Sequence, residues 1–321
     1  MALNCTNAPA SVPSNSGVAG IGVLLSFIIT AVLALIISAS LIFQDARGHT
    51  HKTPVLRRKL LGAYSDQQIL TGIGIQSVGL AIMDQLVPYH FFIIWMLSLL
   101  SMATHNTSLL ALVHDFRRDW VLRWLRQVLI FINLVLSATY GIFILRGVED
   151  GIDSSTLPIA CVLQPDARFS SGMSSGNKIL STIGTIVVIA GNVIVFGLAT
   201  WYLHSRTQRY YKAIQIIGLL LMTAISIGAI VRVSLIADAF SHNPPITLSD
   251  NGETQWSFGQ LLSVGMLLLP VVSIIEILRG EIQYAPPVAD SDKDRLLGDN
   301  ELQSNPQINA FQPSPFGYHR N

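Results

Sequence analysis

The 321-residue sequence has little charge: Asp, Glu, Lys and Arg make up 12% of it, whereas half of its residues are hydrophobic. Soluble globular domains carry charge on about a quarter of their residues. The deficit is concentrated in seven apolar stretches, each close to the ~20 residues with which a helix crosses a bilayer. The composition therefore excludes an ordinary soluble enzyme and predicts an integral membrane protein.

Cysteine and net charge are also scarce. Two cysteines exclude an iron-sulfur site and a disulfide-rich scaffold, and a net charge of +1 argues against a nucleic-acid partner. The seventh apolar stretch holds no lysine for retinal, and no two stretches offer the facing histidines that haem needs. His105 lies inside the third stretch without a second His, Cys or carboxylate one turn away. We therefore expect no metal and no other cofactor.

The apolar stretches predict an all-α bundle of seven transmembrane helices in residues 18–280. It follows an exoplasmic leader, 1–17, which has no basic residue and so does not resemble a cleavable signal peptide. The proline-rich residues 281–321 are expected to form a disordered cytoplasmic tail. The expected spans lie near 18–43, 66–86, 89–113, 127–146, 179–203, 213–236 and 256–278.

The distribution of basic residues predicts the orientation of the bundle. Cytoplasmic connections of membrane proteins are enriched in Lys and Arg. With the N-terminus outside and the C-terminus in the cytoplasm, sixteen of the twenty basic residues fall on the inner side. Such a protein belongs in a membrane of the secretory pathway: the plasma membrane or an endosomal or vacuolar membrane.

The two cysteines and one sequon fall in segments expected outside. Cys5 lies in the leader and Cys161 in the long loop 147–177, so both face an oxidising compartment where a disulfide can persist. Two free thiols on the same side are equally compatible with the sequence, because their distance cannot be read from it. Asn4-Cys5-Thr6 matches the acceptor pattern for N-glycosylation.

The second span opens with Ser65, Asp66, Gln67 and Gln68, a pattern typical of a helix cap. We expect Ser65 to cap the helix and Gln68 to reach back to its first turn. Further along, Gly72 and Gly79 share one face of the helix, and small residues on such a face let a neighbouring helix approach closely. Asp84 lies near the outer end of the second span and Arg232 near the outer end of the sixth. Because both are expected at a similar depth, they are a candidate ion pair.

Polar residues recur inside the spans at helical spacing. Such residues are costly in hydrocarbon and normally face the bundle interior. They either join helices to one another or line a polar pocket. The candidate pocket residues are Ser101, His105, Asn133, Tyr140 and Asn192.

Residues 114–126 combine four arginines with Phe116, Trp120 and Trp124 on one helical face. This pattern fits a helix in the headgroup region of an anionic leaflet. The alternative is a docking surface for a cytoplasmic partner, whose identity the sequence does not indicate.

The segment from Tyr64 to Ile73, which contains Ser65-Asp66-Gln67-Gln68, resembles a family of fungal seven-span integral membrane proteins. Tyr89, His90, Trp95 and His105 match the same group, and the resemblance covers roughly residues 20–280. It implies a seven-helix fold. It carries over no catalytic residue, because this family is largely uncharacterised, with some members near secondary-metabolite genes.

Two function classes follow. The first is a non-catalytic, receptor-like or sensor-like bundle that contacts membrane lipid and binds a small apolar or amphipathic ligand. The second is a membrane-embedded enzyme, similar to a terpene cyclase, or an accessory protein of secondary metabolism. A cyclase requires acids deep in the bundle, whereas Asp66, Asp84 and Glu276 lie near span ends.

Overall fold

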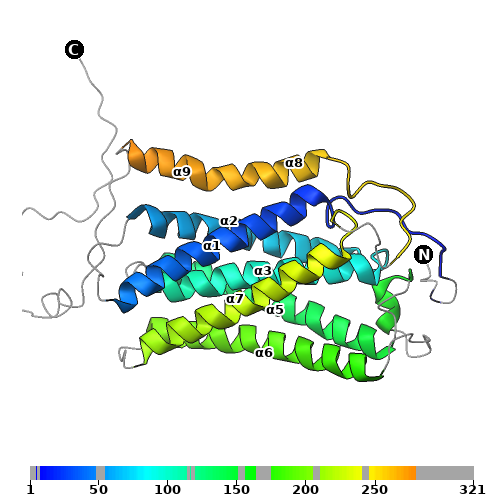
Figure 1. The fold of residues 1–321 in the computed structure, drawn as a ribbon, viewed down its shortest axis with the longest axis horizontal. Coiled ribbons are helices and arrows are strands. Elements are labelled where there is room, and N and C mark those ends of the chain that lie inside the picture. The colour runs from blue at the N-terminus through cyan, green and yellow to red at the C-terminus, as the bar shows by residue number, and fades with distance from the viewer. Residues whose placement is uncertain are drawn as a thin grey trace, which may run out of the picture. The chain divides into compact units, whose positions relative to one another are not determined.

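The computed structural model describes residues 5, 8–47, 55–113, 116, 120–150, 156–163, 175–204, 210–240 and 246–279. These belong to one compact unit, Met1–Tyr284, and the second unit, Ala285–Asn321, lies outside the described residues. The described part is helical and contains no β-strand, as the sequence predicts. Its long helices run side by side (Figure 1). They are α1 (Ile21–Ala46), α2 (Val55–Ala81), α3 (Pro88–Ala111), α5 (Trp120–Asp150), α6 (Ser175–His204) and α7 (Tyr211–Ile236).

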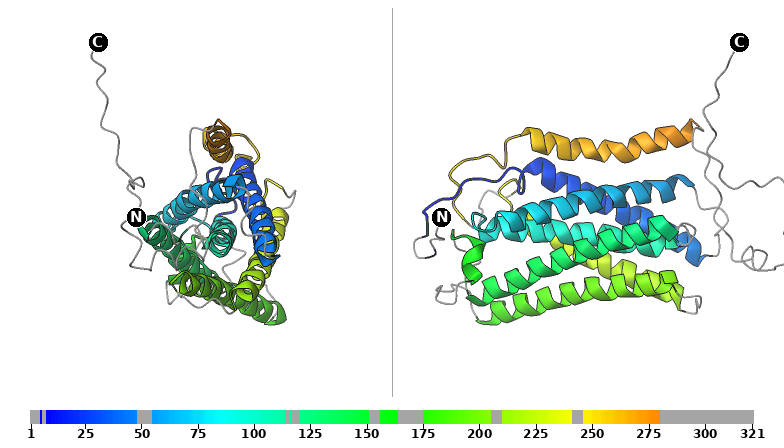
Figure 2. Two further views of the ribbon diagram at one scale, coloured as in Figure 1. Left: turned by 90° about the vertical axis from the view of Figure 1, so that its left-hand side faces the viewer. Right: turned by 180° about the vertical axis from the view of Figure 1, so that it is seen from behind.

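Helix α3 lies at the centre of the bundle. It contacts α1, α2, α5, α6 and α7, which surround it when the bundle is viewed end-on (Figure 2). All of its membrane-length window is buried. Serine, threonine and alanine side chains along it let the surrounding helices approach closely. The central position of α3 explains why its polar residues and its apolar residues are equally hidden.

The outward faces of the other helices are apolar. Large hydrophobic side chains are exposed along them, for example Phe131 of α5, Ile194 of α6 and Leu220 of α7. In water such a surface would be an aggregation hazard, whereas in a bilayer it meets lipid chains. Five helices are long and apolar enough to cross a membrane: α1, α3, α6, α7 and residues 123–147 of α5. The architecture is that of a membrane-embedded helical bundle.

Helix α2 differs from its prediction. It begins at Val55 rather than at Asp66, and it ends at Ala81. Hydropathy marks where a segment is apolar, but a helix continues wherever its backbone hydrogen bonds are made, and here it includes Arg57, Arg58 and Lys59. Its buried polar residues Gln67, Gln68 and Gln76 also lower its hydropathy. These polar residues, together with the charged ones, explain why α2 is not among the five apolar helices.

The seventh predicted span is interrupted. It consists of α8 (Phe258–Gly265), the 3-10 turn η3 (Met266–Leu268) and α9 (Leu269–Leu278). Ser257 caps α8 by accepting a hydrogen bond from the Gln260 backbone. The interruption precedes Pro270, which cannot donate a backbone hydrogen bond and crowds the carbonyl four residues earlier. This pair of helices packs on α1 and α2, outside the ring around α3 (Figure 2).

Candidate functional site

His105 of α3 lies at the centre of a buried hydrogen-bonded cluster between α2, α3 and α5, which we call the core network. Its Nδ1 lies 3.2 Å from the hydroxyl of Ser65 on α2, and its Nε2 lies 3.0 Å from the hydroxyl of Ser101. Both ring nitrogens are therefore occupied, and His105 is completely buried. Ser108 extends the network by donating to Ser65.

The core network continues through amides toward the other end of α2. Asn133 of α5 donates to Ser101 at 3.2 Å and accepts from Gln76 at 2.5 Å. Tyr140 donates to the backbone carbonyl of Gln76. The glycine face of α2 makes these contacts possible, because a Cβ on Gly72 would collide with Ser101 and one on Gly79 with Tyr140.

The structure thus brings together four of the five candidate pocket residues: Ser101, His105, Asn133 and Tyr140. Asn192 of α6 lies apart from them, 3.4 Å from the amide of Asn106 on another face of α3. The hydrogen bonds of the four residues go to one another, to the side chains of Ser65 and Gln76, and to backbone carbonyls, all within the bundle. This arrangement favours helix joining over ligand binding for the core network.

The Ser65 to Gln68 pattern does not cap a helix, and that prediction is wrong. These residues lie in the interior of α2, where Ser65 bonds to His105 and Asp66 pairs with Arg126 of α5. The amide oxygens of Gln67 and Gln68 are buried without a hydrogen-bond partner among the described residues. The sequence pattern was misleading because polar residues that cap helix ends can also face a neighbouring helix.

The predicted ion pair between Asp84 and Arg232 is not formed. Asp84 lies in the turn after α2 and Arg232 in the last turns of α7, and both side chains are exposed. The charged contacts found among the described residues include Arg126 with Asp66, and His90 beside Glu253. Similar depth in a bundle does not bring two helices into contact, and α2 and α7 are separated by α1 and α3 (Figure 2).

The predicted disulfide is confirmed. Cys5 and Cys161 are bonded, with their Cα atoms 5.7 Å apart. Cys161 is buried in the short helix η2 (Ile159–Leu163), whose Ile159 donates a backbone hydrogen bond to Leu86 in the α2–α3 turn. The disulfide therefore ties the leader to the end of the bundle at which α2 meets α3, which we call the leader end. Asn4 lies outside the described residues.

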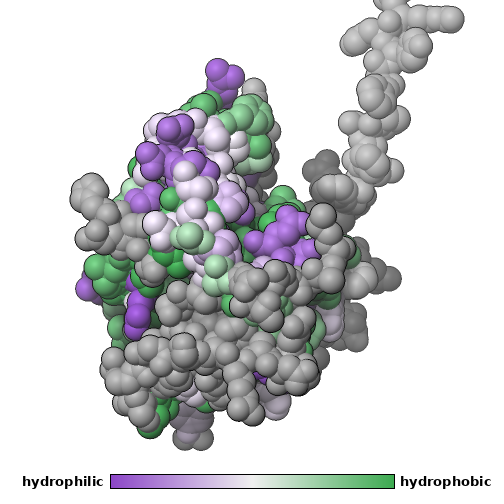
Figure 3. Space-filling model, turned by 90° about the vertical axis from the view of Figure 1, so that its right-hand side faces the viewer, coloured by the Kyte–Doolittle hydropathy of each residue, from purple (hydrophilic) through white to green (hydrophobic). Residues whose placement is uncertain are grey.

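Beyond the disulfide, the leader crosses the leader end along a defined path. The carbonyl of Pro9 accepts a hydrogen bond from Thr156 at 2.6 Å. Val12 then pairs with the α7–α8 loop, donating to Thr247 at 3.1 Å and accepting from Ser249 at 2.8 Å. Hydrophilic and near-neutral residues gather over part of this face, with hydrophobic residues around them (Figure 3).

A second link joins Ser14 of the leader to Asp250 of the α7–α8 loop. The Ser14 hydroxyl and the Gly252 backbone, 2.9 Å away, both donate to this carboxylate. These hydrogen bonds hold the pKa of Asp250 below its ordinary value. The stabilisation is therefore present at neutral pH and is lost as the pH falls through the lowered pKa.

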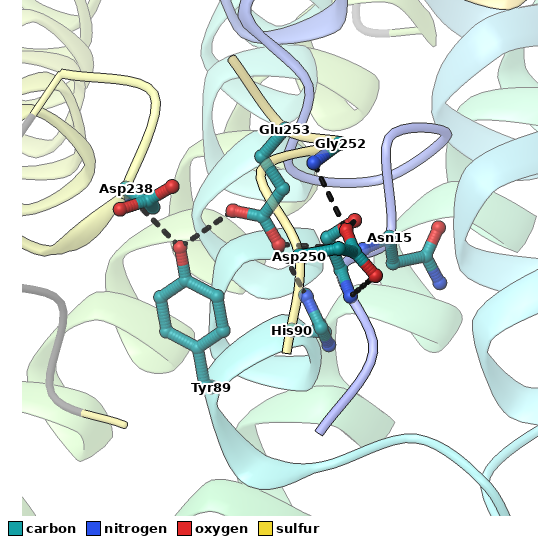
Figure 4. Close-up of polar contacts among 8 residues, drawn as sticks. Asn15, Tyr89, His90, Asp238, Asp250, Gly252 and Glu253 are labelled. Carbon is teal, nitrogen blue, oxygen red and sulfur yellow. Dashed lines mark hydrogen bonds and ion pairs between the residues drawn. The ribbon is translucent and has the colours of Figure 1, made fainter. Parts of the chain in front are cut away.

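Glu253 is the centre of a buried cluster beneath the leader, which we call the carboxylate cluster. Its side chain is completely buried and lies 2.6 Å from Nε2 of His90 and 2.9 Å from the hydroxyl of Tyr89 (Figure 4). The backbone of Asn15 donates to the same carboxylate, and Tyr89 accepts from the backbone of Asp238. One carboxylate therefore joins the leader, α3 and the loops that follow α7.

A cavity of about 380 Å³ lies next to the carboxylate cluster. Its wall is formed by the leader, the α2–α3 turn and the segment before η2. His90 belongs both to this wall and to the carboxylate cluster. The lining residues are Pro9, Ser11, Val12, Pro13, Ser14, Asn15, Ile82, Gln85, Leu86, Val87, His90, Thr156 and Pro158. Seven of these thirteen residues are apolar and six are polar, so the cavity combines an apolar wall with polar groups, as small-molecule sites do.

The sequence offered one sign of this site, the adjacent Tyr89 and His90 at the start of a span. Their partner Glu253 is 163 residues away from His90, in a loop that carries no recognisable motif. A pairing across that separation depends on how the helices pack, so sequence inspection missed it. Among the described residues, no group of three or more His, Cys, Asp and Glu is arranged to hold a metal ion.

The fold and the site define the chain as a helical membrane bundle with a disulfide-tied leader and a cavity at the leader end. Neither a family model, nor a curated protein, nor a solved structure matches this chain.

Proposed function

We propose that this chain is a receptor-like or sensor-like membrane protein of seven spans, with the leader end outside, that binds a small ligand in the leader-end cavity. Helices α2 and α8–α9 supply the two spans beyond the five apolar helices. The resemblance to fungal seven-span proteins agrees with this count, and the disulfide agrees with an oxidising outer compartment.

The observation that carries the proposal is the carboxylate cluster beside the cavity. A buried carboxylate is expensive unless several donors compensate it, and here Tyr89, His90 and the Asn15 backbone do so. The cluster fixes the leader over the cavity and orients His90 at its wall. In the core network, by contrast, the ring of His105 and the amide of Asn133 spend their hydrogen bonds within the bundle. The buried amide oxygen of Gln76 has no partner among the described residues, but it does not line the cavity. The leader end is therefore the better ligand site.

Binding can be tested by filling the cavity. Gln85 lines it from an exposed position, so Gln85→Trp is expected to occupy the ligand volume without disturbing the core. Purified protein in nanodiscs is screened against small amphipathic molecules for a rise in unfolding temperature. A ligand at 100 times its Kd stabilises the folded state by about 2.7 kcal/mol, and Gln85→Trp should abolish that rise.

Ile217→Trp is the matched control, because Ile217 is exposed on the outer face of α7, away from the cavity lining. It should keep the full ligand effect. Stabilisation that survives in Gln85→Trp would place the ligand elsewhere and contradict the proposal.

The orientation predicts glycosylation of the leader. When the chain is expressed in eukaryotic cells, N-glycosidase should increase its electrophoretic mobility, and Asn4→Gln should remove this effect. An Asn-Xaa-Thr acceptor engineered within residues 281–321 should stay unmodified, because the tail lies in the cytoplasm. Modification of the engineered tail acceptor would reverse the proposed orientation.

A further inference from the structure

Helices α5 and α6 enclose unpaired polar atoms at the end of the bundle opposite the leader, which we call the far end. Gln127 of α5 is only 5% exposed, and neither its amide oxygen nor its amide nitrogen has a hydrogen-bond partner among the described residues. The same holds for Nε of Arg123 on α5 and for the hydroxyl of Thr200 on α6. Native proteins rarely leave buried polar groups unpaired, so these atoms indicate a missing partner.

The packing of α5 on α6 places these three residues together (Figure 1). Two ring contacts join the helices at this end: Trp124 with His204 at 5.3 Å, and Phe131 with Phe196 at 6.3 Å. Gln127 lies between the two contacts along α5, and Thr200 lies between them along α6. Thr200 is four residues from each of the two α6 rings, so it shares their face toward α5. Arg123 precedes Gln127 by one turn on the same face of α5.

Arg123 brings a positive charge into this interface. Its side chain is partly buried, and within the described part of the chain it forms no ion pair, whereas the neighbouring Arg126 pairs with Asp66. Water can satisfy an amide or a hydroxyl, but it does not compensate a cation that has left bulk water. An anion with several acceptor oxygens can do both, because all three side chains donate hydrogen bonds. A phosphate group has these properties.

The surroundings of the three residues point to membrane lipid as the source of the phosphate. Trp124 and Trp201 are exposed on the outward faces of α5 and α6, and tryptophan is enriched at the level of the lipid headgroups. Next to them, toward the middle of the bundle, both helices expose apolar side chains, namely Val128, Phe131, Ile194 and Leu198. The donors therefore lie at headgroup depth, beside a surface that suits acyl chains.

We propose that Arg123, Gln127 and Thr200 form a site for an anionic phospholipid whose headgroup carries hydroxyls. Nε of Arg123, the amide nitrogen of Gln127 and the hydroxyl of Thr200 donate to the phosphate oxygens. The amide oxygen of Gln127 accepts a hydrogen bond from a headgroup hydroxyl. Because Arg123 and Gln127 have several rotatable bonds, both can turn toward the headgroup without a movement of the helices. The site shares no residue with the leader-end cavity and does not depend on it.

Two lipids with the same acyl chains and the same phosphodiester test the proposal: dioleoylphosphatidylglycerol and dioleoylphosphatidylcholine. Only the first has a net negative charge and headgroup hydroxyls. Native mass spectrometry of the full chain, released from detergent micelles, measures the binding of each. Phosphatidylglycerol is expected to bind about tenfold more tightly, as an added hydrogen bond with a charged group allows, and it alone should raise the unfolding temperature.

Variants of α5 separate a lipid site from a merely unpaired amide. Arg123→Gln should weaken phosphatidylglycerol about tenfold, and Gln127→Leu should weaken it about fivefold. Without added lipid, Gln127→Leu should be at least as stable as the parent, because it removes an unpaired buried amide. Arg47→Gln is the matched control: Arg47 is an exposed basic residue at the end of α1, a helix that packs on α2, α3, α7 and α8. It should bind the lipid as the parent does.

Equal binding of the two lipids would overturn the proposal. So would phosphatidylglycerol binding that Arg123→Gln and Gln127→Leu leave unchanged, since the bound lipid would then be unspecific. Should Arg123→Gln fail to fold, Gln127→Leu and Thr200→Val decide, because both replace a polar group by an apolar one of similar size.

Glycerol 3-phosphate distinguishes the source of the phosphate, because it carries the phosphate and the hydroxyls without acyl chains. It is expected to leave the unfolding temperature unchanged. A rise equal to that with phosphatidylglycerol, and lost in Gln127→Leu, would assign the site to a soluble phosphate and overturn the assignment to lipid.

Discussion

Replacing Glu253 with alanine is expected to lower the free energy of unfolding by about 3 to 5 kcal/mol, the usual cost of removing one partner from a buried ion pair. The substitution leaves the ring of His90 and the hydroxyl of Tyr89 buried without their acceptor. It also frees the Asn15 backbone, so the leader loses one of its attachments.

The effect is measured by thermal and denaturant unfolding of the purified protein in nanodiscs. Asp250→Ala is the matched control, because Asp250 lies three residues earlier in the same loop but is exposed. Its hydrogen bonds with Ser14 and Gly252 are open to solvent, so a much smaller loss of stability is expected. Glu253→Gln keeps an acceptor oxygen and should fall between the two. Equal losses for Glu253→Ala and Asp250→Ala would show that the carboxylate cluster has no special structural role.

Removal of the disulfide is the second change with a large expected effect. Cys5 and Cys161 are separated by 156 residues, and closing so long a loop restricts the unfolded chain strongly. Chain-entropy arguments give about 5 kcal/mol for a loop of this length, although measured values are often smaller. The double variant Cys5→Ser, Cys161→Ser avoids a leftover thiol, and it should unfold at a clearly lower temperature than the parent.

Reducing agent supplies the control for this prediction. It should destabilise the parent protein to the level of the double variant and have no effect on the double variant itself. Because the leader forms one wall of the cavity, the double variant should also bind cavity ligands more weakly. An unchanged unfolding temperature would contradict this prediction, because the contacts of the folded leader at Val12 and Ser14 cannot replace a restriction of the unfolded chain.

The sequence predicted correctly those features that depend on the residues of a single segment. A membrane helix must be apolar over its whole length, so hydropathy located α1, α3, α5, α6 and α7 to within a few residues at most ends. The pairing of the disulfide was also predictable, because the chain offers only one pair of cysteines, but whether the bond forms depends on a distance that only the fold sets. The glycines of α2 were correctly assigned to a close helix contact, since their spacing alone places them on one face.

Sequence misled where a polar residue has two possible partners. Ser65 and Gln68 have the composition of a helix cap, but their helix begins earlier at Val55. The local pattern is the same in both cases, and only the position of α3 beside α2 decides that Ser65 bonds to His105. The predicted ion pair between Asp84 and Arg232 was wrong for a related reason, because equal depth in the membrane does not show which helices are neighbours.

By itself, then, the sequence determined which segments form apolar helices, that α3 carries polar residues at helical spacing, and which two cysteines can bond the leader to the bundle. Tertiary structure alone decided that His105 is enclosed by hydroxyls and that His90 meets Glu253 across 163 residues. The physical reason is range. Hydropathy and helical periodicity act within a few turns of chain, whereas a hydrogen bond or an ion pair requires two atoms within about 3 Å, a condition that only helix packing can meet.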